Sequence, residues 1–523
     1  MTANAADLRP TPADAYLSAQ EQFDSIITNL QSAQAQRMTH SQLEQLLEIE
    51  GRELLRRMLQ AHLDERGPGR VCEPVIDAVG KTHTHQRLQR RSIQTIFGQV
   101  EISRQGYAGR GLESLHPLDA ELNLPPENYS HSLQRQLAEA TAKESYDETI
   151  QTVSQRTGVS VPKRQAEESA RRAAADFTLF YQKQRVATAR EAKKTGQILV
   201  ITTDGKGIPM RQNDLREATR QAAQSRQPRL TTRRSKGEKT KTKRIGTVAS
   251  VSTIAPFVRT PEQIVREFNP VEVPLPPRPR PEDKRVWASI KEPPERIIEQ
   301  AFEEALRRDP KRTKQWIALV DGNSTQLGLL SVAAEDYAVD LVVILDIIHV
   351  LEYLWDAAWA FHTEGDRRAE AWVQERLIGI LRGHSSRVAA GLTRSATLRG
   401  LSAKHREPID RCAHYLLKYR DFLRYDQYLA AGYPIATGVI EGACRYLVKD
   451  RMEITGARWS LAGAEAVLQL RSLRASNDFD EYWEFHLQQE YRRNHAGRYA
   501  DGKVPLIPKS NGKTTPSTLK LVK

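Results

Sequence analysis

Short apolar runs rich in β-branched residues alternate with helical patterns through the middle of the chain. Five of these runs predict β-strands, at residues 198–204, 246–255, 285–290, 316–320 and 339–345. A helical pattern over about 295–308 separates the third run from the fourth. The order predicts an α/β domain built on a mixed five-stranded sheet with helices, in which the first strand ends at Asp204 and the fourth at Asp321.

Residues 1 to about 66 have a helical pattern with one apolar stripe. The stripe is formed by Leu46, Ile49, Leu54, Met58 and Leu59. Such a stripe can pack against the protein's own core or against a second subunit. We expect core packing, because this is the commoner use of an amphipathic helix.

A β-hairpin and a pair of helices follow. Residues 87–107 alternate around Phe97-Gly98-Gln99, which predicts a hairpin. Residues 130–191 are strongly helical, and a Gly-containing turn at 158–162 separates two helices within them. This spacing is that of a helix-turn-helix, and Lys163 and Arg164 open its second helix. DNA contact by this pair and an ordinary helical hairpin are both compatible with the pattern.

The last third of the chain is mostly helical. Residues 364–435 are helical and basic, with no catalytic pattern, and an inserted helical domain is the simplest account. A further helix begins near Gly438 and carries Glu441. The tail from residue 477 is basic, and we expect disorder past Pro505 because the composition becomes rich in Pro, Lys and Thr.

Net charge points to a polyanionic partner. The 523 residues include 78 Lys+Arg and 65 Asp+Glu, which gives a net charge of +13. Such an excess favours nucleic acid over a membrane surface. Three cysteines without a CxxC pair, no signal peptide and no apolar run of membrane-spanning length indicate a cytoplasmic protein. Bound DNA would associate it with the nucleoid, and no membrane partner is expected.

Three acidic residues form the candidate catalytic set. Asp204 and Asp321 each follow a predicted strand and precede a glycine, and Glu441 lies on the later helix. Carboxylates at the ends of adjacent strands, with one on a nearby helix, supply the oxygen ligands that two Mg²⁺ ions need for phosphoryl transfer. We therefore expect Asp204, Asp321 and Glu441 to bind two Mg²⁺ ions, for which Mn²⁺ can substitute.

Two auxiliary residues follow the fifth predicted strand. Asp346 stands where a helix cap is expected, and His349 lies one turn further on the same face. From this stretch alone, a capping aspartate and an ordinary hydrogen-bonded histidine are the simpler interpretation.

Basic side chains surround the candidate acids in the sequence. Residues 211–244 carry a dense charge run, which we expect to be a mobile loop that contacts phosphates. Arg445 and Lys449 lie at i+4 and i+8 from Glu441, where they could meet phosphates or, for Arg445, form a salt bridge with Glu441. The expected DNA-contacting residues of the second half are Lys206, Arg233, Arg234, Lys236, Lys239, Lys241, Lys243, Arg244, Arg445, Lys449, Arg458 and Trp459.

The motifs together resemble a known family. They are Thr-Thr-Asp204-Gly-Lys-Gly, Leu-Val-Asp321-Gly-Asn, Leu-Asp346-Ile-Ile-His349 and Gly438-Val-Ile-Glu441-Gly-Ala-Cys-Arg, with Gly-Ala-Arg-Trp459-Ser after them. In this order they resemble DDE-type transposases of bacterial insertion sequences, of the ISKra group related to mutator-like elements. The resemblance covers roughly residues 90–495.

The resemblance implies an RNase H-like catalytic domain interrupted by an all-helical insertion. Its three acids correspond to Asp204, Asp321 and Glu441, and Asp346 and His349 match a Cys/Asp-x-x-His signature. Asp346 competes with Asp321 for the second metal-ligand role, and we prefer Asp321. The expected parts are 1–115 (helices and hairpin), 116–195 (helix-turn-helix-like), 196–363 (first catalytic part), 364–435 (insertion), 436–476 (last catalytic part) and 477–523 (tail).

The expected activity is cleavage at the ends of an insertion sequence and transfer of the freed strand into target DNA. Its partners would be double-stranded DNA, as terminal inverted repeats and as target, and at least one further copy of the chain on DNA. Relatives often carry a cysteine finger after the hairpin, but residues 105–111 hold no cysteine, so no zinc is expected. The alternatives are a catalytically silent DNA-binding protein or repressor, and a hydrolytic nuclease of the same fold.

Overall fold

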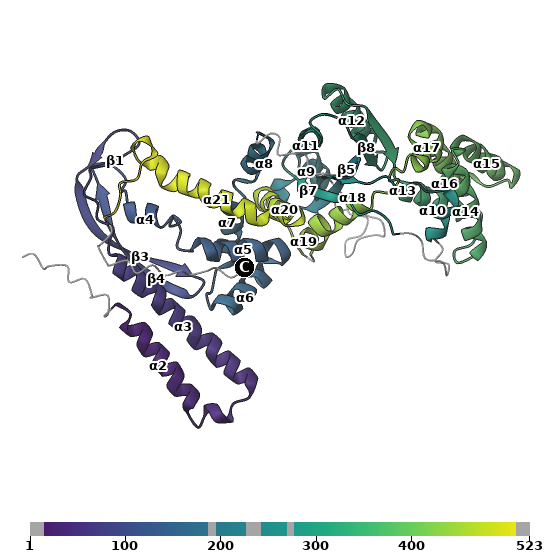
Figure 1. The fold of residues 1–523 in the computed structure, drawn as a ribbon. Helices are drawn as coiled ribbons and strands as arrows, with labels where there is room; N and C mark the ends of the chain where they lie inside the picture. The colour runs from purple at the N-terminus through teal and green to yellow at the C-terminus, as the bar shows by residue number, and fades with distance from the viewer. Residues whose placement is uncertain (1–14, 187–194, 226–241, 269–276, 455, 509–523) are drawn as a thin grey trace, which may run out of the picture. The chain divides into compact units, whose positions relative to one another are not determined.

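The computed structural model describes residues 15–186, 195–225, 242–268, 277–454 and 456–508 (Figure 1). The chain divides into two compact units, each with its own core. The first unit combines the residues up to Asp176 with those from Asp480 onward, and the second holds Phe177–Phe479. Among the described residues, no helix has both the length and the apolar content needed to cross a lipid bilayer.

The first unit begins with a helical hairpin made of α2 (Leu17–Gln31) and α3 (His40–Arg66). Thr39 starts α3 through a capping box, in which its side chain accepts from the backbone N–H of Gln42 and the Gln42 side chain accepts from the backbone N–H of Thr39. The helical prediction for this region is confirmed.

The core-packing prediction for the apolar stripe of α3 is wrong for two of its members. Ile49 is 64% exposed and Met58 is 45% exposed, whereas Leu46, Leu54 and Leu59 are half-buried. The reason is that α3 has few neighbours of its own chain: α2 packs on one side and the following hairpin on another.

The predicted β-hairpin is present as β3 (His85–Thr95) and β4 (Gly98–Ala108), paired antiparallel over their full length. The short strands β1 (Val75–Ile76) and β2 (Thr82–His83) precede it, and α4 (Pro117–Glu121) follows. Arg104 of β4 pairs with the buried Asp119, so this arginine serves the unit's own structure.

Three helices form a compact cluster after the hairpin: α5 (His131–Lys143), α6 (Tyr146–Thr157) and α7 (Lys163–Ala173). Gly158 ends α6 with φ of +70°, a conformation that glycine adopts easily. The shared core is formed by Leu133, Leu137, Ala140, Val153, Val159, Val161 and Ala166. The predicted helix, turn and helix are confirmed.

The last α-helix of the described residues belongs, from Asp480 onward, to the first unit. It is α21 (Phe479–Asn494), followed by η5 (Ala496–Arg498) and η6 (Ala500–Gly502). Tyr482 and His486 of α21 are fully buried, so the prediction of a tail from residue 477 is wrong for this stretch. Aromatic residues recurring every three to four positions were the helical signal. The expected disorder past Pro505 falls mainly on residues outside the described ranges.

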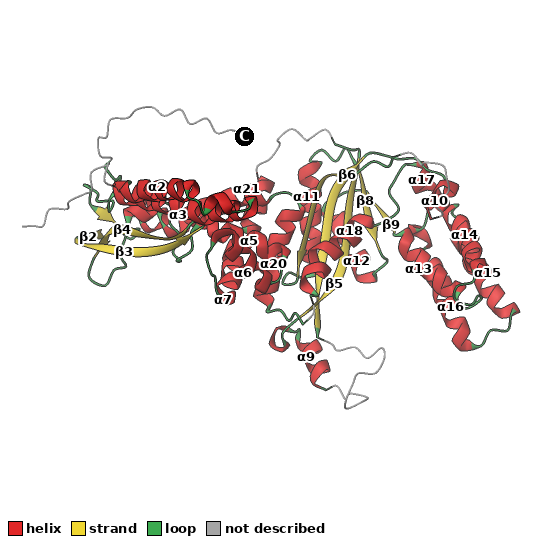
Figure 2. Cartoon of the chain, turned by 90° about the horizontal axis from the view of Figure 1, so that it is seen from below, coloured by secondary structure: helices red, strands yellow, loops and turns green. Residues whose placement is uncertain are grey.

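The second unit is built on a five-stranded mixed sheet in the order β7-β6-β5-β8-β9 (Figure 2). β5, β6 and β7 pair antiparallel, and β8 and β9 join parallel to β5. All five predicted strands are confirmed in sequence order. They are β5 (Ile198–Pro209), β6 (Lys243–Ile254), β7 (Glu282–Ser289), β8 (Gln315–Val320) and β9 (Leu341–Leu345).

The helices around the sheet come before, between and after the strands in the sequence. They are α8 (Phe177–Val186), η2 (Gln212–Asp214), α9 (Glu217–Gln224), α10 (Pro261–Phe268), α11 (Pro294–Arg308), α12 (Ser324–Asp336) and α13 (Ile347–Ala358). α11 covers one face, where Phe302 packs against Trp316 with ring centroids 6.0 Å apart. Large buried side chains such as Trp287, Trp316 and Phe302 make this the main core of the unit.

An all-helical stretch follows α13, as the sequence predicts. It contains α14 (Arg367–Leu381), α15 (Ser385–Leu398), α16 (Ala403–Lys418), η3 (Arg420–Phe422) and α17 (Tyr425–Ala430). The chain then returns to the sheet through α18 (Gly438–Ala443), the π-helical segment η4 (Cys444–Lys449), α19 (Asp450–Met452) and α20 (Leu461–Ala475).

The charge run at 211–244 is not the continuous mobile loop that the sequence predicts. Residues 211–225 include η2 and α9, and Leu215 is only 6% exposed. Asp214 also accepts a hydrogen bond from the backbone N–H of Leu461 at 3.1 Å. One buried leucine and one capping carboxylate therefore anchor the start of the run.

Candidate active site

The sheet brings three aspartates to one level on neighbouring strands. In the parallel ladders Thr202 pairs with Leu319, and Val320 pairs with Leu345. Asp204 lies two residues after Thr202, Asp321 two residues after Leu319, and Asp346 directly after Leu345. Residues that are equally far along paired parallel strands lie side by side, so the three carboxylates lie at one level, just beyond the paired parts of β5, β8 and β9.

Asp204 does not end its strand, contrary to the sequence prediction. β5 continues to Pro209 because β6 pairs with it along its whole length, and Asp204 lies opposite Val248. The pairing with β8 stops earlier, at Thr202. Asp204 therefore lies where β5 separates from β8 while still paired to β6. There its Oδ2 accepts from the Cys444 thiol at 3.0 Å.

α18 brings Glu441 to the same face of the sheet. A cavity of about 280 Å³ lies on this face, and both Thr202 of β5 and Val439 of α18 line it. Side chains alternate along a strand, so Asp204 shares the face of Thr202. Partial burial raises the pKa of the Glu441 carboxyl most, followed by the negative charges of Asp346 and Glu352, a side-chain hydrogen bond to Asp346 and the charge of Asp204. Glu441 is therefore surrounded by other acids.

Asp346 and Asp321 differ in how fully their oxygens are used. Asp346 is 3% exposed and caps α13, as predicted, by accepting from the backbone N–H of Ile348 at 3.0 Å. It also accepts from the backbone N–H and the hydroxyl of Thr437. Asp321 is half-buried and accepts from the backbone N–H of Asn323 at 3.0 Å. Asp346 is thus a structural anchor as well as an acid of the site.

Over the described ranges, no Lys or Arg forms an ion pair with Asp204, Asp321, Asp346 or Glu441. Of these four acids Asp346 is buried, Asp204 and Asp321 are half-buried, and Glu441 is exposed. No three of the four bring ligand oxygens within 4.8 Å of one another. The site is therefore a group of facing carboxylates with uncompensated charge. Such oxygen donors suit a hard divalent cation.

His349 lies one turn beyond Asp346, as predicted, and is half-buried. Its Nδ1 lies 3.0 Å from a carboxylate oxygen of Glu352, a residue that the sequence analysis did not single out. The imidazole packs edge-on against Tyr353 and Tyr415, with ring centroids 5.5 and 6.2 Å away. His349 therefore borders the acids and is held by an aromatic group.

Tyrosines of α16 and α17 hold the strand ends that carry the aspartates. The hydroxyl of Tyr415 donates to the carbonyl oxygen of Asp321 at 3.2 Å, and that of Tyr419 donates to the carbonyl oxygen of Gly322 at 2.6 Å. Tyr425 donates to the carbonyl oxygen of Leu345 at 2.8 Å, immediately before Asp346. The sequence analysis missed these residues; the repeated tyrosines between 415 and 433 were the available signal.

Some of the predicted cations lie beside the acids. Lys206 follows Asp204 on the same strand face, and its charge acts on Cys444. Lys243 pairs with Glu453, and Arg244 donates to the carbonyl oxygen of Ile290 at 3.1 Å. Five other predicted cations lie outside the described residues: Arg233, Arg234, Lys236, Lys239 and Lys241.

The helix of Glu441 widens into a π-helix at η4, which α-helical spacing did not predict. Arg445 forms no salt bridge with Glu441; its guanidinium lies 3.7 Å from Asp450, five residues on. Lys449 and Arg458 are exposed. Arg445 and Lys449, the two cations on the helix of Glu441, are therefore both exposed to solvent.

Trp459 is buried, so the prediction that it belongs to the DNA-contacting surface is wrong. Trp459 is 6% exposed, and its indole N–H donates to the carbonyl oxygen of Met452 at 3.0 Å. The Arg451 guanidinium, 3% exposed, lies over the Trp459 ring. The pair packs inside the second unit and fixes the segment after Glu441.

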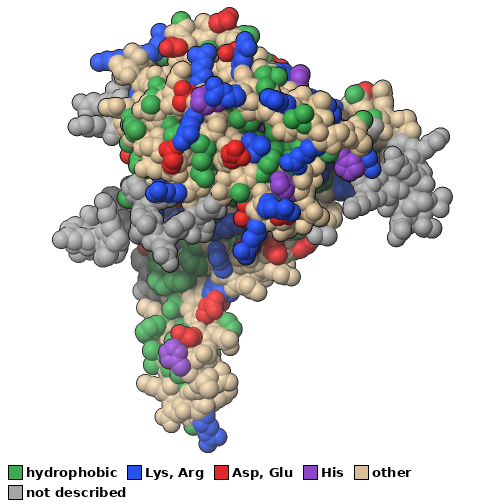
Figure 3. Space-filling view, turned by 90° about the vertical axis from the view of Figure 1, so that its right-hand side faces the viewer, with side chains coloured by type: hydrophobic (Ala, Val, Ile, Leu, Met, Phe, Trp, Pro, Cys, Tyr) green, Lys and Arg blue, Asp and Glu red, His purple; other side chains and the backbone are tan. Residues whose placement is uncertain are grey.

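Basic side chains elsewhere are partly engaged. On α7, Lys163 pairs with Asp147 at 2.6 Å and Arg164 pairs with Glu168 at 3.1 Å. Figure 3 shows the side of the molecule on which α15 lies, with Lys and Arg side chains spread over that face among fewer acids. Exposed Arg387 and Arg394 stand seven residues apart on α15, at the spacing of one helix face.

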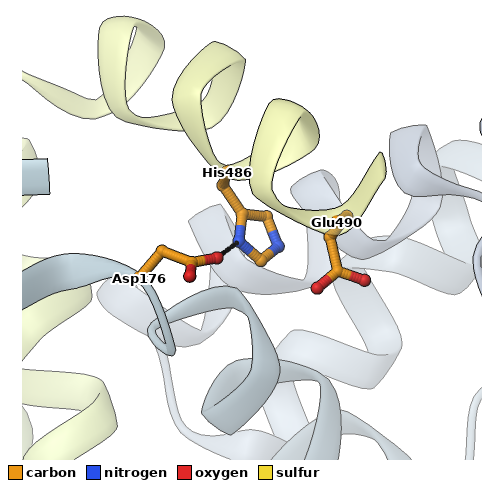
Figure 4. A group of neighbouring side chains, drawn as sticks. All are labelled: Asp176, His486 and Glu490. Carbon is orange, nitrogen blue, oxygen red and sulfur yellow. Dashed lines mark hydrogen bonds and ion pairs between the residues drawn. The ribbon is translucent and has the colours of Figure 1, made fainter. Parts of the chain in front are cut away.

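One group in the first unit has the spacing of metal ligands: Asp176, His486 and Glu490 (Figure 4). His486 Nδ1 lies 2.7 Å from Asp176, and the Arg493 guanidinium lies 2.6 Å from the other oxygen of Asp176 and also pairs with Glu490. Arg493 therefore already supplies the positive charge that the two carboxylates need. We interpret this group as a structural network that ties α21 to the end of α7.

No protein-family model matches the chain, and a search of curated proteins finds no match to its sequence.

Proposed function

We propose that the chain is a DDE-type DNA transposase. Its second unit would be an RNase H-like domain, and α14 to α17 its helical insertion. The observation that carries the proposal is a group of four acids that have no cationic partner among the described residues and lie where β5 separates from β8, just after β8 and β9, and on α18. The strand order of three antiparallel strands followed by two parallel ones agrees with this assignment.

In this proposal Asp204, Asp321 and Glu441 hold two divalent ions, Mg²⁺ or Mn²⁺, with Asp346 beside them. Bound ions would activate a water and stabilise the leaving 3′-oxygen at the DNA end. Asp321 is the preferred second ligand because its carboxylate accepts fewer hydrogen bonds from its own chain than that of Asp346. Lys206, Lys449 and Arg458 would contact DNA phosphates in this proposal, which the exposure of Lys449 and Arg458 supports.

The helical insertion has a defined task in the proposed mechanism. Tyr415 and Tyr419 hold the backbone at Asp321 and Gly322, and Tyr425 holds the residue before Asp346. The insertion would thus fix two of the acidic side chains while it offers a basic outer face to DNA. The net charge of +13 and the basic faces support double-stranded DNA as substrate.

The test is cleavage and joining of a labelled duplex that carries the end of the chain's own element, with Mg²⁺ or with EDTA. We expect Asp204→Asn, Asp321→Asn and Glu441→Gln each to lower both steps by at least about 10³-fold, with DNA binding retained. The matched control is Asp356→Asn, an exposed acid of α13 paired with Arg411. If Asp321→Asn is active and Asp346→Asn is inactive, Asp346 and not Asp321 is the second metal ligand.

Two other outcomes distinguish the alternatives. If the chain binds the element end but never cuts it, a silent DNA-binding protein or repressor is the better description. If it cuts but releases every product without joining, it is a hydrolytic nuclease of the same fold.

A further inference from the structure

The first unit contains a cavity of about 230 Å³ whose lining is rich in cations. Arg91 of β3, Arg104 of β4 and Arg498 of η5 line it. Asp119 of α4 is the one acid among the described residues of the lining, so the formal charge of the lining is 3 − 1 = +2. We call this space the arginine cavity.

Strand pairing places two of these arginines on one face of the β-hairpin. In the β3–β4 ladder Arg91 lies opposite Ile102, and Arg104 lies opposite Gln89. Residues two apart on a strand share a face, so Arg91 and Arg104 are diagonal neighbours across the hairpin. Like charges so close repel each other, and an anion beside them removes this cost.

Asp119 supplies only part of the negative charge. Its Oδ2 accepts from Arg104, and Nη1 of Arg91 lies 3.8 Å from the same oxygen. One carboxylate therefore serves two guanidinium groups that are largely withdrawn from water. Arg498 pairs with Glu113 at 3.1 Å, but the Glu113 side chain is 91% exposed, and water weakens such a pair. Positive charge remains in excess in the arginine cavity.

A histidine of the lining responds to this excess. Burial, followed by the charges of Arg104, Arg498 and Arg91, lowers the pKa of His116 to about 4. The imidazole is therefore neutral at pH 7, and its Nε2 lies 2.9 Å from Oε1 of Gln89. Surroundings that disfavour an added positive charge favour an anionic ligand.

Two buried atoms of the lining side chains have no hydrogen-bond partner within the described ranges: Nε of Arg104 and Oδ1 of Asp119. Buried polar groups are nearly always paired in folded proteins. The Arg104 Nε–H is a donor, whereas the Asp119 oxygen is an acceptor. A ligand that satisfies both must accept a hydrogen bond and also donate one.

A phosphate that keeps a hydroxyl has this combination. Inorganic phosphate near neutral pH carries one or two negative charges and at least one O–H. Sulfate and the phosphodiesters of a DNA backbone carry none. A phosphomonoester keeps its hydroxyl below a second pKa of about 6. The cavity is smaller than the roughly 300–1,000 Å³ of sites for drug-sized ligands, so it suits an ion or a small terminal group.

We infer that the arginine cavity binds a phosphate that keeps a hydroxyl, either inorganic phosphate or the end of a small monoester. Its oxygens accept from Arg104 and Arg498, and its hydroxyl donates to Oδ1 of Asp119. The inference depends on the first unit alone and does not require the proposed catalytic activity.

Calorimetric titration of the full chain with phosphate and with sulfate, at pH 6 and equal ionic strength, tests the binding. We expect phosphate to bind at least about tenfold more tightly than sulfate, because only phosphate pairs Oδ1 of Asp119. Arg498→Gln should weaken phosphate binding at least about tenfold. Arg90→Gln is the matched control, since Arg90 is exposed and lies on the opposite face of β3 from Arg91.

Glycerol phosphate at the same pH distinguishes the two sources. Affinity equal to that of inorganic phosphate assigns the cavity to the ends of monoesters, and binding of inorganic phosphate alone assigns it to the ion.

Asp119→Asn tests the contact with the hydroxyl. The amide can keep the bond to Arg104 through its oxygen and then offers an N–H where Oδ1 stood. We expect this variant to bind sulfate at least as tightly as phosphate, and thermal unfolding checks that it is folded. If it does not fold, Arg498→Gln still tests the site. Three results would overturn the inference: no phosphate binding below about 10 mM, equal affinities for both anions in the parent, or phosphate binding unchanged by Arg498→Gln.

Discussion

Two glutamates of the second unit, Glu304 and Glu441, stand in opposite electrostatic surroundings. Glu304 of α11 is 1% exposed, and its carboxylate lies 2.9 Å from Arg285, 2.6 Å from Arg307 and 2.8 Å from Arg308. Burial alone would raise its pKa, but Arg285, Arg308 and Arg307 lower it well below the usual range. Glu441 has other acids around it, and its pKa is raised.

The two surroundings indicate two roles: Glu304 stabilises the fold through its arginines, whereas Glu441 is available to bind a cation. A buried acid paired to arginines is already satisfied, and removing it leaves the arginines without their partner. An acid placed among other acids costs folding energy unless something positive arrives from outside. The same unit therefore contains a completed charge cluster and an incomplete one, and only the incomplete one calls for a cation.

The largest effect is expected at the completed cluster. Glu304→Gln should lower the free energy of unfolding by about 3–5 kcal/mol, because Arg285 would stay buried without a counter-charge and Arg308 would keep only Asp283, at 3.7 Å. Denaturant unfolding followed by the fluorescence of the buried Trp287 and Trp316 measures it. Glu299→Gln is the control on the same helix, since its partner Arg296 is at the surface, and it should cost under about 1 kcal/mol.

The lowered pKa of Glu304 determines how the difference in unfolding free energy between the parent and Glu304→Gln depends on pH. Because the folded pKa of Glu304 is depressed, its contribution is fully present above the unfolded value near 4.5 and is lost as the pH falls through the lower folded value. The gap between the parent and Glu304→Gln should thus be constant from neutral pH to about pH 4.5 and shrink only below it. A gap that closes already above pH 5 would contradict the assignment.

A smaller effect tests the incomplete cluster. Mg²⁺ well above its dissociation constant should stabilise the parent by about 1–3 kcal/mol, visible as a rise in Tm that EDTA reverses. Glu441→Gln should lose most of this rise, whereas Glu304→Gln should keep it despite its lower starting Tm. An equal rise in all three proteins would place the ion elsewhere.

The smallest effect concerns the tyrosines that hold the strand ends. Tyr419→Phe removes the hydrogen bond to the carbonyl oxygen of Gly322, which is worth about 1 kcal/mol. We expect strand cleavage about fivefold slower, with Mg²⁺ stabilisation kept. Tyr433→Phe serves as the control, since the Tyr433 ring stacks against Tyr428 without touching either aspartate turn. If Tyr419→Phe and Tyr433→Phe cleave DNA at equal rates, the backbone turn after Asp321 keeps its position without the Tyr419 hydrogen bond.

The sequence predicted the order of the five strands because each is a short β-branched run bounded by polar residues. It did not predict where β5 ends, because the end of a strand depends on its partner: β6 carries β5 five residues beyond Asp204. It assigned Trp459 to a basic surface because arginines surround it in sequence, but an aromatic ring with a hydrogen-bonded indole is as easily buried.

The sequence patterns also did not predict contacts between residues far apart in the chain. Nothing in the motif around Asp321 indicates that Tyr415 and Tyr419, nearly a hundred residues later, hold its backbone. The exposed side chains of the α2–α3 hairpin show the reverse problem: an apolar stripe predicts a helix, but not how much of the stripe the rest of the chain covers.

The π-helical turn at η4 shows in the pattern of buried residues, which the sequence alone does not reveal because the charged Arg451 is among them. Buried residues recur every four positions there, as Ala443, Leu447 and Arg451 in one row and Cys444, Val448 and Met452 in the next. In an α-helix, a residue four positions on is rotated by about 40° from the first. Two rows of residues that stay buried on one side at this four-residue interval therefore indicate a turn wider than that of an α-helix.

That turn makes the number of residues in the segment part of the design. Glu441 faces the acids upstream of η4, and Met452, downstream of it, receives the indole of Trp459. Six residues at the wider π-helical turn rotate the chain about as far as five residues of an α-helix, so deleting one residue between 444 and 449 would restore α-helical winding and leave the two ends in nearly the same relative orientation. A second deletion could not be absorbed in this way, and it would rotate Glu441 against the Trp459 anchor by about 100°.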